Sequence, residues 1–280
     1  MKENVNMSDA NLVNAKQLYL DLLKRSLTNW IHGHEEFVLV EPSGIGRFVG
    51  ELVNPKGAMM VVQKRFDESK RAIGQDWPTP LLAHTMVGLK RLDNLQMCIE
   101  SVLADKIPGD FIETGVWKGG STIFMRGLLK VYGITNRRVW VADSFEGLPP
   151  PNIKDYPDDK GDIHYTIDSL KISLDQVKEN FKAYGLLDEQ VVFLKGWFSE
   201  TLPKARVEEL AVLRLDGDMY ESTMDAIVSL FPKLSKGGYI IVDDYCIPSC
   251  RKAILDFRMK YSISDEILDI DGTGVYWRKL

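Results

Sequence analysis

Two pairs of aspartates in this chain have the residue type and spacing of a metal site. Asp216 and Asp218 follow one short apolar run, and Asp243 and Asp244 follow the next one along the chain. Aspartates are also common in turns and caps, but four acids at one edge of a sheet would repel each other without a cation. Because carboxylate oxygens favour hard cations, we expect Mg²⁺ here, with Mn²⁺ as an alternative.

Such a cation would assist a reaction at a hydroxyl oxygen. An alcohol is a poor nucleophile at neutral pH, and a divalent cation that coordinates its oxygen lowers its pKa. A nearby carboxylate can then accept the proton. The aspartates therefore indicate activation of a hydroxyl group on a substrate.

A glycine-rich segment indicates a bound cofactor. Residues 113–121 read Glu-Thr-Gly-Val-Trp-Lys-Gly-Gly-Ser after a short apolar run. Glycines permit a tight turn and a close approach of the backbone to a ligand. The spacing is not G-x-G-x-x-G, and the acidic Glu113 suits the cationic sulfonium and amino groups of S-adenosylmethionine (SAM). A glycine-rich turn without any ligand is the alternative interpretation.

Two further segments fit the same cofactor. Asp143 ends a second apolar run and is followed by Ser144. A carboxylate there can accept hydrogen bonds from both hydroxyls of a ribose, although an Asp-Ser pair can equally be a helix cap or turn. Gly196, Trp197 and Phe198 follow a third run. Their aromatic side chains could line an adenine pocket or, as is more common, belong to the core.

These residues need a sheet that brings the strand ends together. Apolar runs predict strands over 111–115, 139–143, 191–194, 212–215, 239–242, 267–270 and 275–278. Helical spacing of apolar residues predicts helices over 88–105, 121–132, 174–184, 204–210, 223–234 and 250–260. This alternation predicts an α/β, Rossmann-like fold with a central, mostly parallel sheet and helices on both faces. Ligands of such sheets bind outside the carboxyl ends of the strands.

The N-terminal part of the chain differs from the rest. Apolar residues at steps of three and four over 12–27 predict a helix that is capped by Ser8 or Asp9. Irregular, glycine-containing sequence follows this helix. We therefore predict an N-terminal segment over 1–76, which forms a helix and a lid or oligomer contact, and a catalytic domain over 77–280.

Bulk properties argue against several classes of function. The chain of 280 residues has a net charge of −5, which does not suit a nucleic-acid-binding surface. No stretch is long and apolar enough to span a bilayer, and the N-terminus lacks the apolar region of a signal peptide. Three cysteines are too few for a disulfide framework. We expect a cytoplasmic protein with reduced thiols that binds neither nucleic acid nor membrane.

The segments around these residues resemble the macrocin O-methyltransferase family, which comprises SAM- and Mg²⁺-dependent sugar O-methyltransferases of antibiotic tailoring. The resemblance covers residues 74–279, and the N-terminal segment matches more weakly. It is carried by the stretches DWP (76–78), HTMVGLKRLDNL (84–95), IETGVWKGGS (112–121), VWVADSFEGLPPP (139–151), LKGWFSETLP (194–203), LRLDGDMYESTMDA (213–226) and GGYIIVDDY (237–245). The resemblance also makes the proline-rich loop 147–166 an expected element of the active site.

The resemblance implies a class I SAM-dependent methyltransferase fold and roles for particular residues. Asp216, Asp243 and Asp244 would be metal ligands, and Asp218 would be the general base. Related catechol-type enzymes use a lysine three residues after the first metal aspartate, but Met219 occupies that position here. The acceptor would be a sugar hydroxyl on a small-molecule natural product, such as a macrolide or an aminocoumarin. The residues expected around SAM are Thr85, Met86, Glu113, Thr114, Gly115, Ser121, Asp143, Ser144, Gly196, Trp197, Phe198 and Asp216.

Two other functions stay open from the sequence alone. An NAD-dependent oxidoreductase or epimerase of sugars would share a similar fold, but the missing G-x-G-x-x-G and the acidic cluster argue against it. A non-catalytic SAM-binding protein would keep the fold, but the intact aspartates argue against lost chemistry. The glycines of residues 44–50 faintly resemble a nucleotide loop, yet no convincing helix follows them. The chain could also form a homodimer.

Overall fold

The computed structural model describes residues 9–35, 37–40, 60–63, 66–75 and 82–280. Three of the sequence-based expectations lie outside these residues. They are the alternative helix cap at Ser8, the glycine pattern of residues 44–50 and the domain boundary between residues 76 and 77. The division into an N-terminal segment and a catalytic domain therefore stays a prediction.

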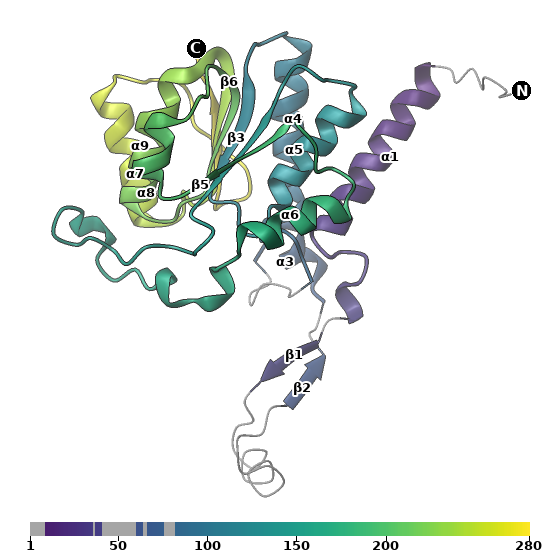
Figure 1. The fold of residues 1–280 in the computed structure, drawn as a ribbon, viewed down its shortest axis with the longest axis horizontal. Coiled ribbons are helices and arrows are strands. Elements are labelled where there is room, and N and C mark those ends of the chain that lie inside the picture. The colour runs from purple at the N-terminus through teal and green to yellow at the C-terminus, as the bar shows by residue number, and fades with distance from the viewer. Residues whose placement is uncertain (1–8, 36, 41–59, 64–65, 76–81) are drawn as a thin grey trace, which may run out of the picture.

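A seven-stranded sheet forms the centre of the molecule (Figure 1). Its strands in spatial order are β5 (Val191–Lys195), β4 (Val139–Asp143), β3 (Asp110–Thr114), β6 (Leu210–Leu215), β7 (Leu234–Val242), β9 (Val275–Arg278) and β8 (Leu268–Asp269). The first five are parallel, and β9 is antiparallel to both of its neighbours. The order along the chain reverses between β3 and β6, and such a reversal opens a crevice at the carboxyl ends of the strands. The predicted α/β fold with a mostly parallel sheet is confirmed.

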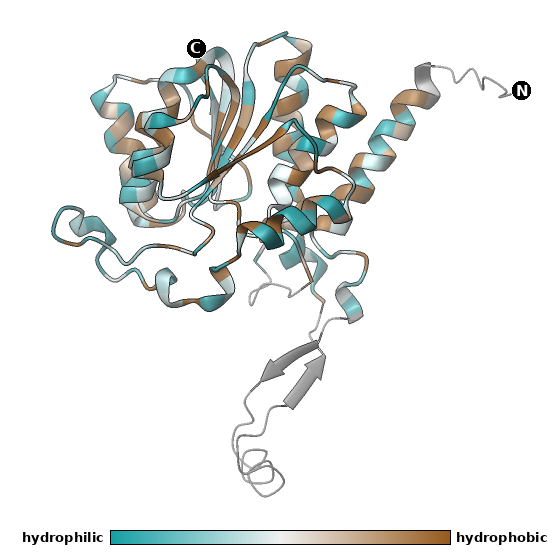
Figure 2. Ribbon diagram, viewed as in Figure 1, coloured by the Kyte–Doolittle hydropathy of each residue, from teal (hydrophilic) through white to brown (hydrophobic). Residues whose placement is uncertain are grey.

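Helices cover both faces of the sheet (Figure 1). The helices among the described residues are α1 (Asp9–Leu27), α3 (Glu68–Ala72), α4 (Leu89–Ala104), α5 (Gly120–Val131), α6 (Leu174–Ala183), α7 (Phe198–Thr201), α8 (Tyr220–Leu230) and α9 (Pro248–Lys260). Strand side chains alternate between the two faces. Phe111 and Val141 join the core formed with α4, α5 and α6, whereas Ile112 and Trp140 join the core formed with α8 and α9. The sheet is accordingly hydrophobic between helices whose outer faces are hydrophilic (Figure 2).

The N-terminal helix α1 belongs to the same core as α4 and α5. Its side chains Leu20, Leu23 and Leu27 are buried in that core. The apolar spacing predicted this helix correctly, but it did not identify the buried face. Several members of the predicted stripe stay exposed, and these are Leu12, Leu18 and Leu22.

One predicted helix is wrong. We expected a helix over 204–210, but residues 202–204 form a single 3-10 turn and Leu210 is the first residue of β6. Leu210 pairs with Asp110 and with Leu234 on the neighbouring strands. These contacts between strands outweigh the helical spacing of the local sequence. The other strands and helices predicted after residue 82 are present. Strands β4 and β9 have the predicted bounds and the remaining elements have shifted ends, and the short helix α7 was not predicted.

Two short strands lie apart from the central sheet (Figure 1). They are β1 (Phe37–Val40) and β2 (Met60–Gln63), and they pair with each other in antiparallel orientation. In the part of the chain that the structure describes, no helix combines the length and the apolar character needed to cross a membrane.

Candidate active site

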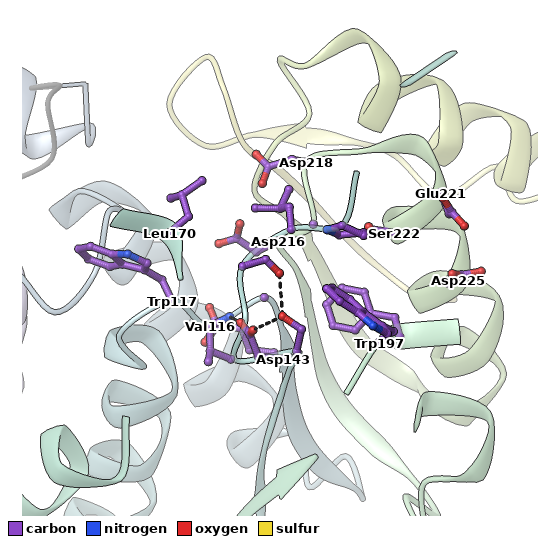
Figure 3. A pocket seen from close by; sticks show the side chains of 18 of the residues that line it. Val116, Trp117, Asp143, Leu170, Trp197, Asp216, Asp218, Glu221, Ser222 and Asp225 are labelled. Atoms are coloured by element: carbon purple, nitrogen blue, oxygen red, sulfur yellow. Dashed lines mark hydrogen bonds between the residues drawn. The ribbon is translucent and has the colours of Figure 1, made fainter. Parts of the chain in front are cut away.

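A cavity of about 290 Å³ lies at the carboxyl ends of the strands, next to the reversal of strand order (Figure 3). Thr114 is the one residue expected around SAM that does not line it. The Thr114 side chain is buried in the sheet, and its carbonyl accepts a hydrogen bond from the Asp216 amide at 2.9 Å. The predicted residues that do line the cavity are Thr85, Met86, Glu113, Gly115, Ser121, Asp143, Ser144, Gly196, Trp197, Phe198, Asp216 and Asp218.

Gly115 lets the turn after β3 pass close to the turn after β6. Its φ is +83°, and a Cβ added there would lie 1.6 Å from the carbonyl oxygen of Asp216. Only glycine satisfies both conditions, because it has no Cβ and adopts positive φ without strain. The sequence predicted a close approach of this glycine to a ligand. The structure shows that the backbone of Asp216 is its closest neighbour.

The Asp143 carboxylate joins the turns that follow β3 and β4. Its Oδ2 accepts a hydrogen bond from the Val116 amide at 2.8 Å, and its Oδ1 accepts one from the Phe145 amide at 2.7 Å. Burial raises the pKa of Asp143, and these amide hydrogen bonds oppose the rise. The Ser144 hydroxyl, 3.4 Å from Oδ1, and the Trp117 amide also act on this carboxylate. Asp143 therefore joins the two turns and shapes the cavity.

Glu113 offers an acceptor for a cationic ligand group. Its Oε1 accepts a hydrogen bond from Arg214, whereas its buried Oε2 has no hydrogen-bond partner among the described residues. Burial raises the pKa of Glu113 to about 7, and the Arg214 guanidinium opposes that rise. A buried polar atom without a partner costs about 1–3 kcal/mol. A donor supplied by a ligand would remove this cost.

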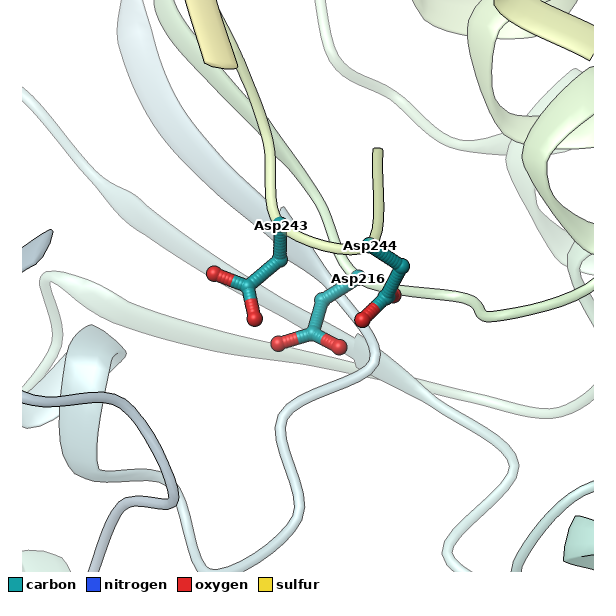
Figure 4. Close-up of side chains that lie close together, drawn as sticks. All are labelled: Asp216, Asp243 and Asp244. Atoms are coloured by element: carbon teal, nitrogen blue, oxygen red, sulfur yellow. The ribbon is translucent and has the colours of Figure 1, made fainter. Parts of the chain in front are cut away.

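Three carboxylates converge beside the cavity (Figure 4). Asp216, Asp243 and Asp244 each provide an oxygen, and these oxygens lie within 4.8 Å of one another. Burial raises the pKa of Asp216 and of Asp244, and the neighbouring aspartates raise both further. The predicted convergence of the two strand ends is therefore present, and the oxygen donors suit a hard divalent cation.

Two arginines offset part of this negative charge. Arg214 on β6 donates to Asp243 Oδ1 and, at 2.8 Å, to Asp216 Oδ2. Arg91 on α4 donates to Asp243 Oδ2. Both guanidinium groups contact the acidic cluster, so they supply positive charge to it in addition to any bound cation.

Asp218, the predicted general base, lies beside this cluster. Its amide donates to Asp244 Oδ2 at 3.0 Å, and its φ of +56° is in the left-handed region. Burial raises the pKa of Asp218 to about 8, with further contributions from Asp216 and Asp162. A carboxylate with a pKa near the working pH is well suited to accept a proton from a reacting group.

Several cavity residues were not among the predicted site residues. Trp117 lies in the glycine-rich segment, so its position in sequence could have identified it. Its indole Nε1 donates to the Ser169 carbonyl at 2.8 Å, which fixes the segment that carries Leu170. No local signal marks Leu170. The proline-rich loop, which was expected at the active site, contributes Gly147, Leu148, Pro149, Pro150 and Asn152 to the cavity. The remaining cavity residues are Val87, Val116, Trp117, Leu170, Ser199, Gly217, Glu221, Ser222 and Asp225.

Asp159 connects the proline-rich loop to helix α8, which begins two residues after Asp218. Its buried carboxylate accepts hydrogen bonds from the first two amides of the helix, Tyr220 at 2.6 Å and Glu221 at 3.0 Å. An α-helix leaves its first amides without partners inside the helix. Asp159 therefore caps α8 from a distant part of the chain and holds the loop against it.

Asp159→Ala should lower both stability and activity. Loss of a helix cap costs about 0.5–2 kcal/mol of unfolding free energy. Because this cap also orients the loop and the start of α8, we expect kcat/KM to fall about tenfold, which corresponds to ~1.4 kcal/mol. The matched control is Ser173→Ala, which removes the cap that accepts from the Gln176 amide on α6. Equal activity of the two variants at similar stability would contradict the prediction.

The strand order, the glycine turn and the acidic strand ends together define a class I SAM-dependent methyltransferase. The family model of macrocin O-methyltransferase (TylF) matches residues 16–279. The chain therefore belongs to the macrocin O-methyltransferase family and is a SAM-dependent O-methyltransferase. Membership of this family confirms the resemblance predicted from the sequence, and it leaves the NAD-dependent alternative without support.

Characterised relatives cover nearly the whole chain. It is 52% identical over 267 residues to 8-demethyl-8-(2,3-dimethoxy-alpha-L-rhamnosyl)-tetracenomycin-C 4'-O-methyltransferase of Streptomyces olivaceus, covering 94% of this chain and 93% of that one. It is 48% identical to mycinamicin III 3''-O-methyltransferase of Micromonospora griseorubida, covering 94% and 96%. The structure of the O-methyltransferase NovP matches with a TM-score of 0.80 and 43% identity, over 94% of this chain and 99% of that one.

Proposed function

We propose that this protein uses a divalent cation, Mg²⁺ or Mn²⁺, to methylate a sugar hydroxyl on a glycosylated natural product. The observation that carries the proposal is the position of Asp218 at the cavity wall, beside three converging carboxylates. The relatives named for a rhamnosyl-tetracenomycin and for mycinamicin III support a glycosylated small molecule as acceptor.

The cavity residues fit SAM. Glu113 Oε2 is a buried acceptor that has no hydrogen-bond partner among the residues that the structure describes, and it suits the ammonium group of the cofactor. Asp143 lines the cavity as an acceptor for the ribose hydroxyls, and Trp197 offers an aromatic surface for the adenine. SAM, when bound, supplies the methyl group that the reaction transfers.

The acidic cluster fits a divalent cation. Its donors are carboxylate oxygens from Asp216, Asp243 and Asp244, which is the ligand type that Mg²⁺ and Mn²⁺ prefer. A cation bound there would lower the pKa of an acceptor hydroxyl and fix its oxygen. Asp216 also lines the cavity, so the cluster opens onto the space where an acceptor would lie.

The chain's own residues would then perform three tasks. Asp218 accepts the proton of the acceptor hydroxyl at its carboxylate. The hydrogen bond from its amide to Asp244 holds it in place during that transfer. Trp117 and Leu170 line the cavity with apolar surface, which excludes water from the reacting groups.

Removal of the metal should abolish methyl transfer while SAM still binds. We expect EDTA treatment to eliminate turnover, and added Mg²⁺ or Mn²⁺ to restore it, because the cation activates the hydroxyl. Calorimetry with SAM on the EDTA-treated protein is the control for an intact cofactor site. Full activity of the metal-free protein would refute the metal part of the proposal.

A pair of acceptors tests the sugar part of the same proposal. A glycosylated macrolide and its aglycone can be incubated separately with the protein, SAM and Mg²⁺. We expect a mass increase of one methylene group only on the glycosylated compound. Methylation of the aglycone alone would show that the acceptor hydroxyl is not on the sugar.

Two further expectations stay predictions. A homodimer would cover apolar side chains that α1 exposes, and these are Leu12, Leu18 and Leu22. Light scattering of the purified protein tests this prediction. The cytoplasmic location expected from the sequence can be tested by cell fractionation.

A further inference from the structure

We propose that Arg91 is a positioning residue that holds Asp243 in the orientation needed to bind the cation. This inference rests on the metal site of the proposed function. Arg91 lies on α4, far along the chain from β7, which Asp243 directly follows. Its side chain is only 13% exposed and has acidic partners on two sides.

The carboxylate of Asp243 is held at both oxygens. Arg214 donates to Oδ1, and Arg91 donates to Oδ2. Two donors on the two oxygens fix both the position and the rotation of a carboxylate group. Each oxygen still has one lone pair for a cation, because a carboxylate oxygen can accept twice. The arginines therefore orient Asp243 without using up its capacity as a ligand.

Arg91 is itself anchored by the segment between β8 and β9. Its Nε donates to Asp271 Oδ2 at 2.8 Å, and its Nη2 donates to Thr273 Oγ1. Asp271 in turn accepts hydrogen bonds from the Thr273 amide at 3.1 Å, the Thr273 hydroxyl at 2.7 Å and the Gly274 amide at 3.0 Å. The guanidinium is thus held by hydrogen bonds at Nε, Nη1 and Nη2. Because Arg91 is fixed in this way, its contact with Asp243 restricts the orientation of that carboxylate.

The positive charge of Arg91 also helps to keep Asp243 in place. The carboxylates of the cluster and its surroundings are those of Glu113, Asp216, Asp218, Asp243 and Asp244. Without positive charge nearby, their repulsion would push the side chains apart. Two guanidinium groups reduce that repulsion but leave an excess of negative charge for a divalent cation. A lysine could supply the charge but not the planar fork that makes these contacts.

Binding of Mn²⁺ to the otherwise metal-free protein, measured by electron paramagnetic resonance, tests this inference without turnover. The variants are Arg91→Ala and Arg91→Lys. Loss of the partners that orient a metal ligand typically weakens metal affinity about 10–100-fold. We therefore expect Arg91→Ala to bind Mn²⁺ about 10–100-fold more weakly than the unaltered protein. Arg91→Lys should recover only part of it, because it restores the charge but not the fork.

The matched control is Arg126→Ala. Arg126 also forms a largely buried ion pair, with Nε at 2.9 Å from Asp188 Oδ1 and Nη2 at 2.5 Å from Oδ2. Neither residue lines the cavity. We expect Arg126→Ala and Arg91→Ala both to lower the melting temperature, but Arg126→Ala should leave Mn²⁺ affinity unchanged. This comparison separates a role in metal binding from a general loss of stability.

The outcomes distinguish this inference from the proposed function. Unchanged Mn²⁺ affinity in Arg91→Ala, while the unaltered protein binds Mn²⁺, would overturn the inference and leave the metal site intact. Absence of Mn²⁺ binding by the unaltered protein would overturn both. If Arg91→Ala does not fold, Asp271→Asn loosens the anchor of Arg91 and should weaken Mn²⁺ binding, toward the lower end of the range of about 10–100-fold. Unchanged affinity in that variant would equally overturn the inference.

Discussion

Asp218→Asn should lower kcat by a factor of about 10²–10⁴ while SAM still binds, because general-base catalysis contributes that range. An amide cannot accept the proton of the acceptor hydroxyl. Asparagine tolerates the left-handed φ of +56° that Asp218 adopts, so the backbone of the site should persist. Steady-state kinetics give kcat, and calorimetry with SAM reports the state of the cofactor site.

A control for the loss of one negative charge is Asp168→Asn. Its carboxylate is 91% exposed and pairs with Lys171 on the surface. We expect unchanged kcat from this variant, since exposed ion pairs contribute little. If Asp218→Asn kept its kcat within about threefold of the unaltered protein, a contribution of 10²–10⁴ from a general base would be excluded, and another group would have to accept the proton.

Gly115→Ala should abolish SAM binding. The new Cβ would have to lie 1.6 Å from the Asp216 carbonyl oxygen, and the residue would have to keep a φ of +83°. The turn after β3 must therefore move away from β6, which displaces Glu113 and Asp216 from the cavity together. We expect SAM affinity to fall by more than about 100-fold, which corresponds to ~2.7 kcal/mol. Calorimetry with SAM measures this loss.

The matched control for this substitution is Gly133→Ala. Gly133 also has a positive φ, +67°, but an added Cβ there would meet nothing within 4 Å. Gly133→Ala should lower stability by about 1–2 kcal/mol, because alanine is strained in the left-handed conformation. Its SAM affinity should be unchanged. Similar SAM affinity in both variants would mean that the close approach of Gly115 to Asp216 is not needed for binding.

Much of the fold could be predicted from local pattern. Buried parallel strands are short apolar runs, and helices repeat their apolar residues every three or four positions. Strand β4 and strand β9 were predicted with their observed bounds. The error at 204–210 arose because Leu210 takes its conformation from pairing with Asp110 and Leu234. Such pairing joins residues that are far apart in sequence, so no local pattern contains it.

Some features of the active site could likewise be predicted from local sequence, and others could not. The acidic strand ends and the glycine turn could be recognised because parallel strands bring their carboxyl ends to one edge. Asp216, Asp243 and Asp244 were predicted to meet there, and their oxygens do converge. Leu170 and the cap by Asp159 could not be predicted, because Leu170 is placed by the hydrogen bond from Trp117 to the Ser169 carbonyl and Asp159 by the fold of the proline-rich loop onto α8.

The sequence by itself determined the class of fold, the family and the residues able to do the chemistry. Residue type and spacing along single strands and turns are enough for those conclusions. Only the tertiary structure decided that Gly115 faces the Asp216 backbone, that Thr114 lies outside the cavity and that Arg91 and Arg214 share Asp243. Each of these is a contact between elements distant in sequence, and the packing of the whole chain fixes such contacts.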